Sequence, residues 1–434
     1  MRWGLWALLA VWLVPSQLMA QASSAAGSAR LVSVEVTGSH RFASRDIVGV
    51  TGLRSASGAK IDVKKEDLQA AADVLARLGL FATVQYRFSS VESGVKVEYQ
   101  VTDAPGVPVT FDNFPWLTDD EIDAALKSSV VLFDGMAPQS GTILDKMSTT
   151  LEKLIAERGV HETVSHNLVT GPDGKQLVQL FRIEGPVLKV QGVEFSDPLA
   201  ANDRGIQQGL PTLIGKPFSR STFELFEFEQ VRPVYLSHAF LRVKFGRPLP
   251  RFTGNPNGPL PDSVVVFAPI EPGPPYAWGG ATWSGNTLVP SAELDKLVEL
   301  KPGEIADGVK LEGTWEHVRE AYARLGYLDA DVNPVPQYDD TAARVRYVVT
   351  IAEGAQYRMG KLVLSGLSLE GERRIRVAWN IPPGAVFDKE AYERFLSTGV
   401  TRAFQGLPFH YQKIGRFLQE DPKTGKVDVM LDFQ

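Results

Sequence analysis

The chain has 434 residues, a formal net charge of −6, 44% hydrophobic and 22% charged residues, and no cysteine. The lack of cysteine excludes disulfides, thiolate metal sites and thiol catalysis. A sequence pI of about 5.7 argues against a nucleic-acid partner, because such binding needs clustered Lys and Arg. The length predicts about three domains at roughly 150 residues each, and the mean hydropathy of −0.07 is typical of a soluble globular protein.

The N-terminus predicts a signal peptide over residues 1–22. Arg2 precedes an unbroken apolar run from Trp3 to Val14, which has the length of a signal-peptide core and falls short of the roughly 20 residues of a membrane span. Small residues follow, so we expect cleavage after Ala20 or Ala22. The alternative is an uncleaved segment that anchors the protein in the inner membrane.

Five similar units follow this segment. Each closes with a run that alternates apolar and polar residues, as a half-buried strand does, and four of the five runs end in an acidic turn. The closing runs are Val95–Val101, Gln176–Ile183, Ser263–Ile270, Val345–Ile351 and Val427–Phe433.

A helical pattern precedes each closing pair of strands. In the first unit Leu68, Ala72 and Leu75 share one helical face, and Gly79 marks the end of the helix. Comparable helices end at Gly159, at His238-Ala239, at Gly326 and at Gly406. A shorter helix lies before each of these, so every unit has the order strand, helix, helix, strand, strand.

The third unit fits this order least well. Pro233 lies inside its long helix and should kink or shorten it. A Pro- and Gly-rich segment, Arg247 to Asp262, is expected to form a loop between its last two strands.

This order and repetition resemble a tandem array of POTRA (polypeptide-transport-associated) domains. The segment Ile351–Gly360, followed by Val363–Gly366, is similar to the junction between consecutive domains in the BamA-type outer-membrane assembly family. Lys301–Glu304, Ala323–Tyr327 and Pro383–Asp388 are similar to that family's turn between helices and end of the second helix. The resemblance implies an α+β fold of five modules in an extended array, each a three-stranded mixed sheet packed on two helices.

The expected modules are POTRA-like 1 to 5, at residues 31–104, 106–186, 187–273, 274–355 and 356–434. The BamA-type family follows its array with a membrane β-barrel, whereas this sequence ends at Gln434, after the fifth closing strand. We therefore expect a free-standing periplasmic array, with a portion of something larger as the alternative.

The regular closing strands are expected at the sheet centres, which places the strand before each of them at an edge. Edge strands can accept a strand from another chain, and the resemblance implies this mode of binding, β-augmentation. Pro334 and Pro336 should blunt the edge of the fourth module. The best acceptor edges are two alternating segments without proline, 81–88 and 409–417, with binding residues Phe81, Val84, Tyr86, Phe88, Phe409, Tyr411, Ile414 and Phe417. The alternative is that neighbouring domains or loops cover these edges.

The predicted function is therefore a non-catalytic, protein-binding scaffold in the periplasm, possessing no cofactor and no metal. Its expected partners are outer-membrane β-barrel proteins, their unfolded precursors, or a separate barrel-containing assembly protein, and it is peripheral to the membrane at most. The alternative function is a structural, divisome-type protein held in the inner membrane by residues 3–14.

Three other features could suggest chemistry. Six scattered histidines show no metal spacing, and no nucleophile or phosphate-loop motif appears, which leaves a hydrolase of envelope polymers without a site. Tyr276, Trp278 and Trp283 could stack on sugar rings, although core packing explains them. Arginines at 373, 374 and 376 could face lipid head groups, although a solvated helix face explains them too.

Overall fold

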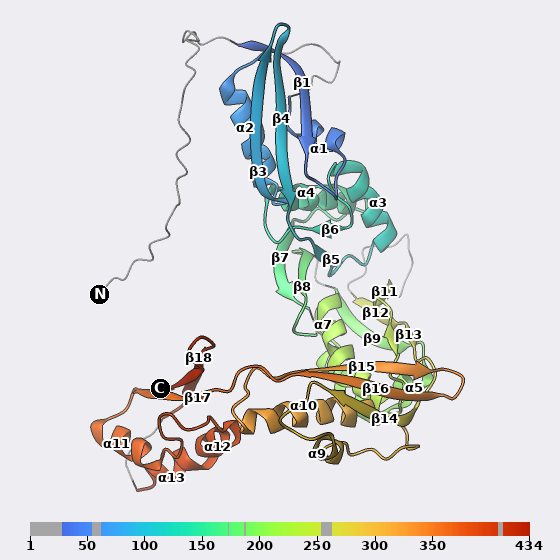
Figure 1. The fold of residues 1–434 in the computed structure, drawn as a ribbon. Helices are drawn as coiled ribbons and strands as arrows, with labels where there is room; N and C mark the ends of the chain where they lie inside the picture. The colour runs from blue at the N-terminus through green and yellow to red at the C-terminus, as the bar shows by residue number, and fades with distance from the viewer. Residues whose placement is uncertain (1–27, 54–61, 172, 186–187, 253–262, 407–410) are drawn as a thin grey trace, which may run out of the picture. The chain divides into compact units, whose positions relative to one another are not determined.

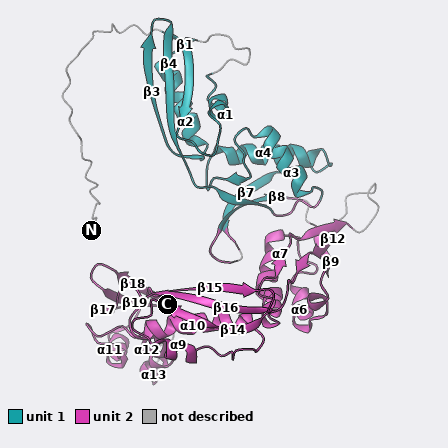
Figure 2. Ribbon diagram, turned by 45° about the vertical axis from the view of Figure 1, so that its right-hand side comes forward, with its two compact units in different colours: residues 1–111, 116–169, 177–184 teal, residues 112–115, 170–176, 185–434 magenta. Residues whose placement is uncertain are grey.

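The structure is a computed structural model that describes residues 28–53, 62–171, 173–185, 188–252, 263–406 and 411–434. The predicted signal peptide at 1–22 and Phe409 lie outside these residues. Two compact units are present, one comprising 1–111, 116–169 and 177–184, and the other comprising 112–115, 170–176 and 185–434 (Figure 2). The described elements repeat one plan, and we number its copies as modules one to five by their opening strands β1, β5, β9, β14 and β17.

Modules one and two lie in the first unit. Their sheets have the strand orders β2-β1-β4-β3 and β6-β5-β8-β7. Module one comprises β1 (Ala29–Thr37), α1 (Ser44–Val50), β2 (Asp62–Val63), α2 (Lys65–Arg77), β3 (Phe81–Val91) and β4 (Gly94–Asp103). Module two comprises β5 (Val107–Phe111), α3 (Asp119–Ser129), β6 (Met136–Ala137), α4 (Thr142–Ala156), β7 (Val164–Thr170) and β8 (Leu177–Ile183).

Module three opens the second unit, with the sheets β11-β12-β9 and β10-β13. Its strands are β9 (Lys189–Phe195), β10 (Lys244–Phe245), β11 (Leu249–Phe252), β12 (Ser263–Ala268) and β13 (Ile270–Glu271). Its helices are α5 (Pro198–Asn202), α6 (Arg204–Gly209), the 3₁₀ turn η1 (Leu210–Thr212), α7 (Arg220–Phe226), the π-helical turn η2 (Glu227–Val231) and α8 (Arg232–Ser237).

Modules four and five complete the second unit, with the sheets β14-β16-β15 and β17-β19-β18. Module four comprises β14 (Ala277–Ser284), α9 (Ser291–Lys296), α10 (Gly308–Arg324), β15 (Asp331–Asp339) and β16 (Arg344–Ala352). Module five comprises β17 (Arg358–Ser365), α11 (Leu369–Ala378), α12 (Lys389–Arg394), the π-helical turn η3 (Phe395–Gly399), α13 (Val400–Phe404), β18 (Ile414–Asp421) and β19 (Lys426–Phe433).

The closing strands lie inside their sheets because their alternating side chains supply the cores. In module four Val345, Val349 and Ile351 of β16 are buried, and so are Trp315 and Val318 of α10. Figure 1 shows α10 running along this sheet. The closing strand pairs in parallel with the opening strand and antiparallel with the edge strand. The predicted α+β class, with mixed sheets packed on helices, is confirmed.

Two details of the prediction need correction. The first two sheets have a fourth strand, β2 or β6, because the short segment between the helices pairs with the opening strand. Part of the expected loop at 247–262 forms β11, which pairs with β12. The long helix of module three consists of α7, the π-helical turn η2 and α8, and Pro233 lies in the first turn of α8.

Consecutive modules of the second unit share core residues. Ala239 and Leu241, which follow α8, pack into the core of module four, and Leu328 packs into that of module five. The opening strands begin on main-chain hydrogen bonds, since the N–H of Tyr276 donates to the carbonyl of Ala239 (3.2 Å) and that of Tyr357 to the carbonyl of Gly326 (2.7 Å). Each module in this series therefore completes the core of the next.

Candidate protein-binding edges

Three edge strands bear on the predicted binding sites. β3, β15 and β18 each stand at one end of the strand order of their sheet, beside the closing strand. An edge strand directs half of its main-chain N–H and C=O groups away from its neighbour, where another chain can bind them. Which residues present these groups follows from the strand pairing.

In β18 the outward groups belong to the even-numbered residues. Lys413 and Gln434 exchange two main-chain hydrogen bonds, of 3.1 and 2.9 Å, so they form a hydrogen-bonded pair. Because such pairs alternate along an antiparallel ladder, Phe417 is paired through its main chain with Met430, whereas Arg416 and Leu418 point their main-chain groups outward. The open edge is thus presented by Ile414, Arg416, Leu418 and Glu420.

β15 carries proline at the equivalent places. Gly285 and Gly366, after the opening strands of modules four and five, approach the carbonyls of Ile351 and Phe433 so closely that a Cβ would lie 2.1 and 1.9 Å away. Aligning the modules on these contacts matches Pro334 with Arg416 and Pro336 with Leu418. Since proline has no N–H, both outward donors are missing there.

β3 keeps both donors. Gly38 makes the same close approach to the carbonyl of Val101, and Val84 pairs with Val101. The alignment then places Tyr86 and Phe88 of β3 at the positions of the two prolines of β15. Module one therefore keeps the outward donors that module four lacks, and binding of another chain at β3 stays a prediction.

The predicted binding residues of β3 differ in accessibility. Phe81 is buried, with its ring 6.0 Å from that of Phe42. Tyr86 is half-buried; its ring lies 5.6 Å from that of Tyr99 and its hydroxyl donates to Gln69. Val84 is half-buried, whereas the side chain of Phe88 is 49% exposed. Phe88 is therefore the residue of this set that another chain could contact most fully.

The second predicted edge lies further along the chain than expected. β18 begins at Ile414, not at 409, and continues to Asp421. Tyr411 precedes it and packs its ring 5.7 Å from that of Phe404 and 5.6 Å from that of Phe433, so Tyr411 belongs to the core of the module rather than to its edge. Ile414 is half-buried and Phe417 is 59% exposed.

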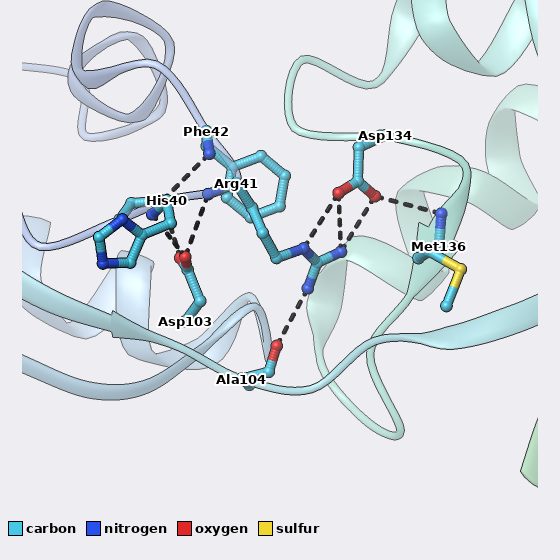
Figure 3. A network of polar contacts seen from close by, with 8 residues as sticks. His40, Arg41, Phe42, Asp103, Ala104, Asp134 and Met136 are labelled. Carbon is cyan, nitrogen blue, oxygen red and sulfur yellow. Dashed lines mark hydrogen bonds and ion pairs between the residues drawn. The ribbon is translucent and has the colours of Figure 1, made fainter.

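The acidic turns after the closing strands have a structural role. In module one Asp103 accepts hydrogen bonds from the Ser39 hydroxyl (2.7 Å) and from the main-chain N–H of His40 (2.7 Å) and Arg41 (3.1 Å) (Figure 3). Desolvation opposes ionisation of Asp103, but these donors keep its pKa below the usual value. In module four Glu353 likewise accepts from Leu288 N–H (2.8 Å) and from the hydroxyls of Tyr322 (3.0 Å) and Thr287.

Arg41 links module one to module two, a contact that the sequence did not predict. Its guanidinium donates to both carboxylate oxygens of Asp134, each at 3.0 Å, and to the carbonyl of Ala104 at 3.0 Å (Figure 3). Such bidentate pairing fixes orientation as well as distance. No motif marks Arg41, because its partner lies more than ninety residues away in the chain.

The other candidate sites are occupied by structural contacts. Tyr276 and Trp278 are buried, and the indole N–H of the half-buried Trp283 donates to Asp295 at 2.8 Å. Arg373 and Arg374 both pair with Glu370. Within the described residues no group of His, Asp and Glu is arranged to hold a metal ion. Among the same residues no helix has both the length and the apolar character needed to span a membrane.

Comparisons with known proteins match parts of the chain. Residues 276–354 match the POTRA family model, described as a surface antigen variable number repeat. A protein of Treponema pallidum (strain Nichols), named "Putative outer membrane protein assembly factor", is 25% identical over 129 residues, which are 30% of this chain and 15% of the relative. This chain therefore matches only a small part of that relative's length.

Solved structures also align with parts of the chain. Haemophilus influenzae BamA POTRA3-5 aligns with 58% of this chain and 98% of its own, at 17% identity and a TM-score of 0.45. POTRA1-3 of Omp85 from Anabaena aligns with 75% of this chain and 96% of its own, at 15% identity and a TM-score of 0.21.

Proposed function

We propose that this chain, a tandem POTRA-domain protein similar to the BamA-type outer-membrane assembly family, is a non-catalytic periplasmic scaffold that assists the assembly of outer-membrane proteins. It binds extended segments of those proteins, or of a barrel-containing partner, by adding them to open sheet edges. The observation that carries this proposal is the difference between edges: β3 and β18 keep the outward donors that β15 lacks.

The chemistry of such an edge suits clients of many sequences. Main-chain hydrogen bonds are available from any extended segment except at proline, so they supply affinity without reading the client's side chains. Side chains near the edge add selectivity. In β3 the row of Val84, Tyr86 and Phe88 offers apolar contact to alternate residues of an added strand.

Photo-crosslinking tests the proposal in the protein's own envelope. A benzoylphenylalanine at Phe88 should capture outer-membrane proteins, and the same probe at Val335 of β15 should capture far fewer, although the two native side chains are 49% and 48% exposed. Tyr86→Pro should abolish capture at Phe88, because it removes an outward N–H. Tyr86→Ala keeps that N–H and should retain most of the capture.

Melting curves establish that each variant is folded before capture is compared. Capture at Phe88 that Tyr86→Pro leaves unchanged would show that strand addition is not the mode of binding. Recovery of inner-membrane or cell-wall proteins instead, on an N-terminus that still contains Trp3, would replace the assembly role with that of an inner-membrane anchor.

A further inference from the structure

The open edge of β18 is complementary to itself. Two copies of this strand can be set antiparallel with Phe417 opposite Phe417. In this register each residue before Phe417 faces the residue that lies equally far after Phe417 in the second copy. Arg416 then faces Leu418 of the second copy, and Ile414 faces Glu420. These are the residues whose main-chain groups point outward, so each such pair can exchange two hydrogen bonds.

The side chains on the sheet face that bears Phe417 also match in this register. Phe417 meets its own copy at a pair without main-chain hydrogen bonds, where facing side chains approach most closely. Lys413 faces Asp421 of the second copy. Asp421 accepts hydrogen bonds from the N–H of Lys423 (3.0 Å) and the hydroxyl of Thr424 (2.7 Å), and its pKa lies below the usual value because of these bonds. The contact with Lys413 is therefore between opposite charges.

Neighbouring registers are less favourable. A shift of one residue would turn the outward groups of one copy toward paired groups of the other. A shift of two residues in one direction places Arg416 against Arg416, and like charges directly opposite each other repel. A shift of two residues in the opposite direction moves the two copies of Phe417 apart, and Lys413 then no longer faces Asp421.

We infer that β18 is a homodimerisation edge, at which two copies of this chain form one continuous sheet about a twofold axis at Phe417. The interface is isologous, as expected for a twofold dimer. It explains why a large aromatic side chain, 59% exposed, stands in the middle of an open edge. The inference goes beyond the proposed function and narrows it: a paired β18 is closed to other segments, so that β3 is the edge at which clients bind.

Disulfide trapping tests the register directly, since the chain has no cysteine of its own. In a pair without main-chain hydrogen bonds the Cα atoms lie about 4.5 Å apart, within the roughly 4.4–6.8 Å that a disulfide spans. Phe417→Cys should form a covalent dimer under mild oxidation. Gln419→Cys is the matched control, because it shares the strand and the face but lies opposite Gly415 of the second copy.

A charge-exchange experiment supplies a second readout in the full chain. Phe417→Glu and Phe417→Lys should each be monomeric in sedimentation at concentrations where the unmodified protein is dimeric, and their equimolar mixture should dimerise. Because the position is exposed, both variants are expected to fold, which melting curves establish. A monomeric unmodified protein, equal crosslinking of Phe417→Cys and Gln419→Cys, or a mixture that stays monomeric would overturn the inference. Since clients are assayed at Phe88, this failure is distinguishable from failure of the proposed function.

Discussion

β15 and β18 occupy the same place in adjacent modules, yet they present different edges. Both pair along their length with a closing strand, and both carry a large apolar side chain at the equivalent positions Val335 and Phe417. Where β18 has Arg416 and Leu418, β15 has Pro334 and Pro336. Two residues thus close an edge while the fold of the module stays the same, which is a known way to prevent unwanted strand pairing. Edge chemistry can therefore vary from module to module without cost to the core.

The strongest test of the difference between β15 and β18 places proline in β18, once at a residue whose main-chain groups pair with β19 and once at a residue whose main-chain groups point outward. Phe417→Pro should remove the hydrogen bond to Met430 and lower the free energy of unfolding of this module by about 1–3 kcal/mol. Arg416→Pro removes only an outward donor and should cost less than about 1 kcal/mol. Urea unfolding measures both changes. Equal losses would show that the outward and inward residues are assigned wrongly.

The second helices of the two modules differ as well, which permits a change in stability that leaves the edges intact. Gly399 lies in the π-helical turn η3, and a Cβ there would meet the buried ring of Phe395 at 2.6 Å. Gly399→Ala should therefore destabilise module five by about 1–3 kcal/mol.

Gly313 of α10 is the matched position, because a Cβ there would meet nothing within 4 Å. Gly313→Ala should stabilise module four by about 0.5–1 kcal/mol through helix propensity. Thermal unfolding should show opposite shifts, and shifts of the same sign would contradict the distinction between the continuous and interrupted helices.

The converse experiment opens the edge of β15. Replacing both prolines, Pro334→Val with Pro336→Val, restores two outward donors, each contributing about 0.5–1.5 kcal/mol. Capture of client segments by a crosslinker at Val335 should rise roughly tenfold, which corresponds to about 1.4 kcal/mol. Pro334→Val alone should give a smaller gain. No gain in either variant would mean that something other than the missing donors keeps β15 from binding.

The smallest expected effect is on the pH dependence of the stability of module four. Desolvation raises the pKa of Glu353, but hydrogen bonds from Thr287, Leu288 and Tyr322 outweigh it and hold the pKa below the usual value. The carboxylate therefore stabilises the fold above the pKa of the unfolded state, and this contribution is lost as the pH falls through the lower folded-state pKa. Glu353→Gln should flatten the acid side of the stability curve by less than about 1 kcal/mol. An unchanged curve would contradict this role.

Much of the fold was readable from the sequence because the closing strands are regular. Gln176–Ile183 begins one residue before β8, and Val345–Ile351 is one residue shorter than β16 at each end, since alternation with one buried face determines both the element and its orientation. The π-helical turns and the strands β2 and β6 were not predicted, because segments this short have no periodicity of their own.

The edges were predicted less well than the cores. The alternating segment 409–417 gave the correct neighbourhood for β18, but its true start depends on the main-chain pairing of Lys413 with Gln434, which side-chain alternation does not encode. For the same reason Tyr411 was assigned to the edge, although its ring packs in the core. The prolines of β15 were informative because they lack a donor in any register.

The core residues that one module contributes to the next couple the folding of neighbouring modules. Ala239 and Leu241 leave module three to complete the interior of module four, and Leu328 leaves module four to enter module five. During synthesis from the N-terminus, the segment that contributes core residues is made before the module into which it packs. The modules can therefore fold one after another in the direction of synthesis. A segment cut at an opening strand would instead begin with an unfilled interior, and it would be prone to aggregate until its predecessor is restored.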